Sequence, residues 1–169
     1  MSPKNKTRKP RKRVFVHIGV GKTDTTALQT FLTQQADAIE RQGISYPFRE
    51  APETVAAGKC SGNLVHVMAS HATRNRRPAD IETLIAHYLP RVIDEAIDAS
   101  RKDTVVLSSE AIAQTTSPEI VAYLQDLSSR HHVTLLGFVR DPYDHMQSSW
   151  KQRVKQGHCQ SLPKHIDLD

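Results

Sequence analysis

A short segment rich in glycine, lysine and threonine, residues 19–26, has the composition of an anion-binding loop. Lys22 supplies a full positive charge, and Gly19 and Gly21 allow the backbone to approach a ligand closely. A helix is expected to begin where this segment ends, so unpaired amide groups and the helix dipole would add positive potential. Hydroxyl groups that can donate hydrogen bonds to the same anion belong to Thr23, Thr25 and Thr26. The segment therefore predicts a phosphate-binding loop.

The spacing of this loop differs from two common nucleotide-binding motifs. A Walker A loop has glycine at the position that Val16 occupies here. The dinucleotide-binding pattern Gly-x-Gly-x-x-Gly has glycine at the position of Asp24. Neither motif is therefore present, and an ordinary glycine-containing turn into a helix is the alternative interpretation.

A second pair of polar residues follows the last predicted strand. Arg140 precedes an Asp-Pro turn, and Ser148 lies eight residues further along, in a predicted helix. An arginine fork together with a hydroxyl group suits a second phosphate. The alternative is a surface arginine that pairs with Asp141 or Asp144.

The apolar pattern predicts strands as short runs of β-branched residues and helices as segments with apolar residues three or four positions apart. The expected strands cover 14–18, 44–47, 104–107 and 133–139. The expected helices cover 25–41, 63–71, 79–100, 117–129 and 143–156. Pro90 is expected to kink or split the helix that contains it. The alternation indicates an α/β fold with a mostly parallel sheet flanked by helices.

Ligands of parallel sheets bind at the carboxyl ends of the strands. Three polar segments follow predicted strands directly, namely 19–26, 108–110 and 140–148. We therefore expect these segments to share one edge of the sheet.

Four segments, in the same order, resemble sulfotransferases that use 3′-phosphoadenosine 5′-phosphosulfate (PAPS). Residues 17–32 are similar to the 5′-phosphosulfate loop, and more narrowly to the His-Ile-Gly-x-x-Lys-Thr-Gly-Thr-Thr opening of bacterial sulfotransferase-family proteins. Residues 43–47 and 105–110 resemble two further strands of that family. Residues 139–148 resemble its 3′-phosphate motif, with the Arg-to-Ser spacing of eight kept. The resemblance implies a P-loop NTPase-like sulfotransferase fold.

The activity that this resemblance implies is transfer of a sulfuryl group from PAPS to a hydroxyl or amine, leaving 3′,5′-ADP (PAP). The acceptor would be a small molecule, a lipid or a saccharide. Lys22 and the loop amides would hold the 5′-phosphosulfate and stabilise the charge that develops on the bridging oxygen. Arg140 and Ser148 would hold the 3′-phosphate. The implied cofactor-binding residues are Gly19, Gly21, Lys22, Thr23, Thr25, Thr26, Arg140 and Ser148.

A general base should take the proton of the acceptor, and Glu110 is the first candidate because it follows a strand expected beside the loop. A carboxylate that pairs with Lys22 or sits at a helix N-terminus is the structural alternative for Glu110. His66 and His17 are the other candidates for the base. His17 lies in a strand expected to be buried on both faces, which favours a core histidine. The histidine spacing predicts no metal site.

Two departures from the family pattern bear on activity. Asp24 stands where the family has glycine. A carboxylate that points into the loop would repel the phosphosulfate, whereas one that points away and caps the helix would cost little. The chain also stops at Asp169, so the sulfotransferase-like domain, residues 14–169, is expected to lack the C-terminal part of the fold. Both departures predict impaired activity.

Composition divides the chain into a tail and a domain. The length of 169 residues suits one domain, and seven of its 23 Lys and Arg residues, but none of its 18 acidic residues, lie in residues 1–13. This basic segment is interpreted as a disordered tail, with weak binding to polyanions as the functional alternative. Two distant cysteines, and the lack of an apolar run long enough to span a bilayer, predict a cytoplasmic protein.

Two other classes of function compete with a sulfotransferase. One is a kinase on a related P-loop scaffold, which the missing Walker glycine and the lack of an evident magnesium-binding aspartate disfavour. The other is a non-catalytic anion- or nucleotide-binding module, or a degenerate homologue of the enzyme.

Overall fold

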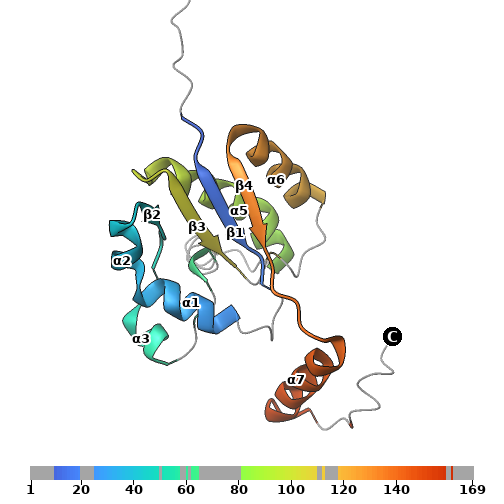
Figure 1. Cartoon of the computed structure of the whole chain (residues 1–169). Helices are drawn as coiled ribbons and strands as arrows, with labels where there is room; N and C mark the ends of the chain where they lie inside the picture. The colour runs from blue at the N-terminus through green and yellow to red at the C-terminus, as the bar shows by residue number, and fades with distance from the viewer. Residues whose placement is uncertain are drawn as a thin grey trace, which may run out of the picture.

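The computed structural model describes residues 10–19, 25–49, 51–57, 60, 62–64, 81–109, 112, 118–158 and 161. Within these ranges four strands form a parallel sheet in the order β2-β3-β1-β4 (Figure 1). The strands are β1 (Arg13–His17), β2 (Ile44–Ser45), β3 (Thr104–Ser108) and β4 (His132–Leu136). The predicted α/β class with a parallel sheet flanked by helices is therefore confirmed.

Helices lie in the connections between the strands, and one more follows β4. They are α1 (Thr25–Gln34), α2 (Ala36–Arg41), α3 (Pro52–Ala56), α5 (Ile81–Ala99), α6 (Pro118–Arg130) and α7 (Pro142–Lys155). Helices α5 and α6 share one hydrophobic core with β1 and β3, so both cover the same face of the sheet. No helix in the described ranges is both long enough and apolar enough to cross a membrane.

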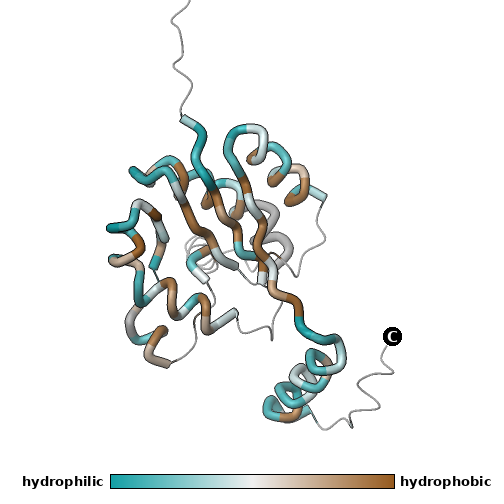
Figure 2. The backbone as a smooth tube through the Cα atoms, viewed as in Figure 1, coloured by the Kyte–Doolittle hydropathy of each residue, from teal (hydrophilic) through white to brown (hydrophobic). Residues whose placement is uncertain are grey.

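Alternation along the two central strands builds this core. Val14 and Val16 of β1 and Val105 and Leu107 of β3 are fully buried and belong to one cluster with α5 and α6. Side chains of successive strand residues point to opposite faces, so these four share the face that the helices cover. Figure 2 shows hydrophobic residues along the strands and mostly hydrophilic residues along α7.

Helix α5 is continuous through Pro90, so of the two expected effects, a kink or a split, the split is wrong. Proline removes one helical hydrogen bond, but Leu89, Val92 and Ile93 around it are fully buried against the sheet. Burial of each such side chain contributes about 2 kcal/mol, which outweighs the lost bond. The hydroxyl of Tyr123 also donates to the Pro90 carbonyl oxygen at 3.0 Å and so ties α6 to this point.

Other boundaries differ from the sequence prediction. The expected helix 25–41 is two helices that meet at Gln35, where φ is −96° and ψ is 8°, although hydrogen bonds of helical spacing continue across it. Helix α3 was not predicted. Strand β4 ends at Leu136, before the expected limit of 139. Phe31, an apolar residue of α1, is 57% exposed. The buried residues of α1 are instead the polar Thr25 and Gln29.

Two basic residues just before β1 bond to the ends of helices. Arg11 donates to the carbonyl oxygens of Ser128, Ser129 and Arg130, which end α6. Lys12 Nζ donates to the carbonyl oxygens of residues 97 (2.8 Å) and 100, at the end of α5. Cations suit these positions because the last carbonyl groups of a helix carry partial negative charge. Composition groups Arg11 and Lys12 with the basic tail, but these hydrogen bonds attach both residues to the folded domain. Residues 1–9 lie outside the described ranges.

His131 lies beside the same basic residues and should make stability depend on pH. Its Nδ1 accepts the Lys12 backbone N–H at 3.3 Å. Burial, first, and then the charge of Arg130 lower the pKa of His131 below its ordinary value. A lowered pKa in the folded state means that the unfolded chain takes up the proton more readily, so stability is lost as pH falls.

We expect the free energy of unfolding to fall between pH 7.5 and 5.5, with His131 contributing up to about 1 kcal/mol, the net value of one hydrogen bond. In His131→Asn the amide oxygen can accept the same N–H without titrating, so the pH dependence should shrink by that amount. Urea unfolding at several pH values measures it. Equal pH dependence of the two proteins would contradict the role of His131.

Candidate functional site

The connections that follow β1 and β3 leave these neighbouring strands in opposite directions across the sheet. From β1 the chain passes to β2, beyond β3, whereas from β3 it passes to β4, on the other side of β1. Neighbouring parallel strands whose connections leave in opposite directions open a crevice at their carboxyl ends, which is where such sheets bind ligands. Helix α1 begins next to this edge in Figure 1. The predicted anion loop, residues 19–26, therefore follows β1 at this edge of the sheet.

The described ends of the loop, Gly19 and Thr25, touch each other. Both residues are buried, and Thr25 begins α1. A Cβ atom at Gly19 would overlap the Thr25 methyl group and would lie 3.1 Å from His17 Cε1. Glycine is thus required at position 19 by space, since Thr25 is β-branched and fixed in the first turn of a helix. Residues 21–24, which include Lys22 and Thr23, lie outside the described residues, whereas Thr26 is half-buried on α1.

A buried hydrogen-bonded network joins β1, β3 and α1 next to Gly19. His17 Nδ1 is 2.8 Å from Ser108 Oγ, and Gln29 Nε2 donates to the same oxygen at 3.1 Å. His17 and Ser108 are side by side because β1 and β3 pair in this register, and all three side chains are buried. Within the described ranges Gln29 Oε1 has no hydrogen-bond partner. A buried polar atom without a partner costs about 1–3 kcal/mol.

Asn63 completes the edge of β3 on the side of β2. Strand β2 pairs with β3 only as far as Val105 in the described ladder. Beyond that point Asn63 Oδ1 accepts the Ser108 N–H at 2.8 Å, and Asn63 Nδ2 donates to the carbonyl oxygens of Val106 (3.3 Å) and Pro47 (2.7 Å). The side-chain amide thus replaces a strand backbone. Gly62 precedes it with φ +98°, and a Cβ there would overlap the Ser108 carbonyl oxygen.

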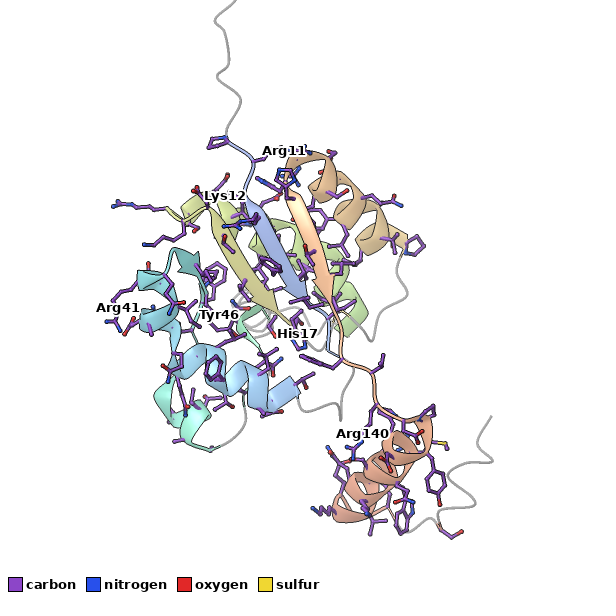
Figure 3. All side chains as sticks on the ribbon, in the orientation of Figure 1. Arg11, Lys12, His17, Arg41, Tyr46 and Arg140 are labelled. Carbon is purple, nitrogen blue, oxygen red and sulfur yellow. The ribbon has the colours of Figure 1, made fainter. Side chains whose placement is uncertain are left out.

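The residues of the second predicted anion site lie on the segment that follows β4. Strand β4 ends early, and the exposed residues 137–140 lead to α7, none of whose described residues is buried. Figure 3 shows Arg140 beside α7 and well separated from His17. Ser148 is half-buried within α7. The structure therefore places Arg140 and Ser148 on the segment that follows β4, apart from His17.

Helix α7 begins as its sequence predicts. The Asp141 carboxylate accepts the backbone N–H groups of Tyr143 (2.9 Å) and Asp144 (3.3 Å), and Pro142 occupies the first helical turn. Asp141, one of the two acids considered as partners of Arg140, is therefore engaged as a helix cap. Phe138, which follows β4, lies next to His17. The centroids of the two rings are 5.4 Å apart in an edge-to-face arrangement.

The candidate bases are placed only in part. Glu110 and His66 lie outside the described residues. Ser109, just before Glu110, is buried, and its N–H donates to the His17 carbonyl oxygen at 3.0 Å. The main chain is therefore held beside β1 up to one residue before Glu110. Within the described ranges no group of three or more His, Cys, Asp or Glu side chains is arranged to hold a metal ion.

Two members of the network, Gln29 and Asn63, were not predicted from the sequence. Gln29 is four residues after Thr25 and so lies on the same face of the helix. This spacing was the signal that the sequence offered. Asn63 follows a glycine in a segment with weak patterns, and a side chain that replaces a strand leaves no periodic signal.

No family model matches the chain, and no curated protein matches it. The likeness to PAPS-dependent sulfotransferases therefore depends on the four segments of the sequence.

Substitution of Gly19 by alanine tests the packing of the loop. We expect Gly19→Ala to lower the free energy of unfolding by about 2 kcal/mol, because the added methyl group must displace Thr25 from the first turn of α1. Urea unfolding monitored by circular dichroism measures this change.

Gly137→Ala is the matched control, since a Cβ there meets nothing closer than the Ile18 carbonyl oxygen at 3.8 Å. Its stability should stay within about 0.5 kcal/mol of the wild type. Equal stability of all three proteins would show that Gly19 and Thr25 are not in contact.

Proposed function

We propose that this chain is a homologue of PAPS-dependent sulfotransferases and transfers a sulfuryl group from PAPS to a hydroxyl or amine of an acceptor such as a saccharide. The observation that carries the proposal is the loop Gly19–Thr25. Its ends touch at the carboxyl end of the central strand β1, which pairs with β3, and it leads directly into a helix. Such a strand–loop–helix unit binds phosphate groups through backbone amides and the helix dipole.

Within this proposal the loop holds the 5′-phosphosulfate. Lys22 neutralises charge on the bridging oxygen as the bond to sulfur breaks, and the loop threonines donate hydroxyl hydrogen bonds. Glu110 is the proposed base, supported by the anchoring of Ser109 to β1 immediately before it. His66 is the alternative base. The buried, hydrogen-bonded position of His17 does not favour it for this role.

The proposed 3′-phosphate site consists of Arg140 and Ser148. Both lie on the segment that leads away from the sheet, where Arg140 is exposed. This position favours a second candidate function, an anion-binding module that does not recognise the 3′-phosphate. The two candidates differ in whether the chain distinguishes PAP from ADP.

Binding of polyanions, if the basic N-terminus has that role, depends on its first residues. Arg11 and Lys12 are engaged with helix carbonyl groups, and Arg13 belongs to β1. The remaining basic residues of the segment are Lys4, Lys6, Arg8 and Lys9. Each phosphate contact made by these residues would add to the salt dependence of binding.

Calorimetric titration of the full chain with PAP, with ADP and Mg²⁺-ATP as comparisons, tests the proposal. We expect PAP to bind more tightly than ADP. Lys22→Ala should weaken both ligands by at least about tenfold, since a charge-assisted hydrogen bond contributes roughly 1.5–3 kcal/mol. Arg140→Ala should remove the preference for PAP and leave ADP binding unchanged.

Arg91→Ala is the control, because Arg91 is exposed on α5 and pairs with Glu95 at 2.7 Å. Equal affinity for PAP and ADP would support the anion-binding module instead. No PAP binding by a folded chain would contradict the sulfotransferase proposal unless Asp24→Gly restores it, which would identify the Asp24 carboxylate as the cause.

A further inference from the structure

The network of His17, Ser108 and Gln29 has a hydrogen-bond direction that follows from its donors and acceptors. The atoms that the structure places within hydrogen-bond reach of Ser108 Oγ are His17 Nδ1 and Gln29 Nε2. An amide nitrogen donates and does not accept, so Ser108 Oγ accepts from Gln29. The hydroxyl has one proton of its own, and His17 Nδ1 is the acceptor at its disposal.

This direction fixes the protonation of His17. A ring nitrogen that accepts a hydrogen bond carries no proton, so Nδ1 is unprotonated and the neutral ring has its proton on Nε2. With the Gln29 amide in its present orientation, protonation of Nδ1 would leave the buried Ser108 hydroxyl without an acceptor among the described residues, at a cost of about 1–3 kcal/mol.

The same ring is in contact with the start of the anion loop. Its Cε1 atom, bonded to both ring nitrogens, lies on the side of Gly19, 3.1 Å from the place of a Cβ atom. Phe138 packs edge-to-face on the ring at 5.4 Å. His17 is therefore held by Ser108 and Phe138 while it supports Gly19, and Gly19 in turn touches Thr25 at the other end of the loop.

We propose that His17 is a positioning residue for the anion loop, held in the Nε2–H form by the relay from Gln29 through Ser108. It acts through Gly19 and Thr25 and not on the transferred group. The inference rests on the proposed function in that the loop is taken to bind the 5′-phosphate of PAP. It adds that an uncharged histidine beneath the loop, oriented by a serine hydroxyl, sets the geometry of that loop.

The first test is the tautomer. Long-range ¹H–¹⁵N correlation spectra of the full chain distinguish protonated from unprotonated ring nitrogens, and the signals missing in His17→Asn assign His17 among the nine histidines. We expect Nδ1 unprotonated and Nε2 protonated. In Ser108→Ala, where the donor is absent, this preference should weaken. A protonated Nδ1 in the wild type would overturn the relay.

The second test is the effect on the loop. Ser108→Ala should weaken PAP and ADP equally, by about tenfold, the equivalent of 1.4 kcal/mol. The ratio of the two affinities should not change, because the 3′-phosphate is held elsewhere. Amide hydrogen exchange at Gly19 and Thr25 should become at least tenfold faster without ligand. Ser129→Ala, an exposed serine on α6, should match the wild type.

His17→Asn is a second variant that keeps a polar group near Ser108 but removes the ring from Gly19. It should show the same faster exchange and the same uniform loss of affinity. Unchanged exchange at Gly19 and Thr25 in folded Ser108→Ala and His17→Asn would overturn the positioning role. Failure of the wild type to bind PAP would contradict the proposed function instead, and the exchange and tautomer measurements would still decide the role of His17.

Discussion

The register between β1 and β3 is the constraint on which the rest of this structure depends. It places His17 beside Ser108, and it sets Val14 and Val16 level with Val105 and Leu107 on the opposite face. A shift by one residue would exchange the two faces, bury the histidine among α5 and α6, and expose the valines. The polar edge and the apolar core are thus two results of a single pairing, and the sheet cannot keep one without the other.

The two ends of the sheet are stabilised by opposite kinds of interaction. At the amino end, Arg11 and Lys12 donate to carbonyl groups that end α6 and α5, so fixed positive charge is matched to helix C-termini. Between those helices, Arg130 bonds to Asp94 at 3.0 Å. The hydroxyl of Tyr123, whose pKa is raised by burial and by Asp94, shares its one proton between the same carboxylate and the Pro90 carbonyl oxygen. At the carboxyl end, side-chain hydrogen bonds join imidazole, hydroxyl and amide groups. Negative helix ends are therefore satisfied far from the edge where an anion would bind.

The sequence predicted the parts of this fold that periodicity and composition determine. Apolar runs located β1, β3 and the start of β4, and the Asp-Pro turn located α7. Pro90 does not split α5, because burial of its neighbours outweighs the local preference of proline. Gln29 and Asn63 escaped prediction because their roles depend on Ser108, a residue distant in sequence. Arg140 keeps the spacing that suggested a phosphate site, but spacing does not determine where the exposed segment 137–140 leads.

The contact between His17 and Ser108 also has a consequence for how the chain folds. These residues are separated by 91 positions, so a long loop must close before the pair can form. Pairings between distant parts of a chain slow folding, because loop closure costs entropy before any contact compensates it. Residues near β1 emerge first from the ribosome, yet the support beneath the loop is assembled only after β3 has been synthesised. During that interval the valines of β1 have no partner strand, and this interval is when the nascent chain most needs protection from misassociation.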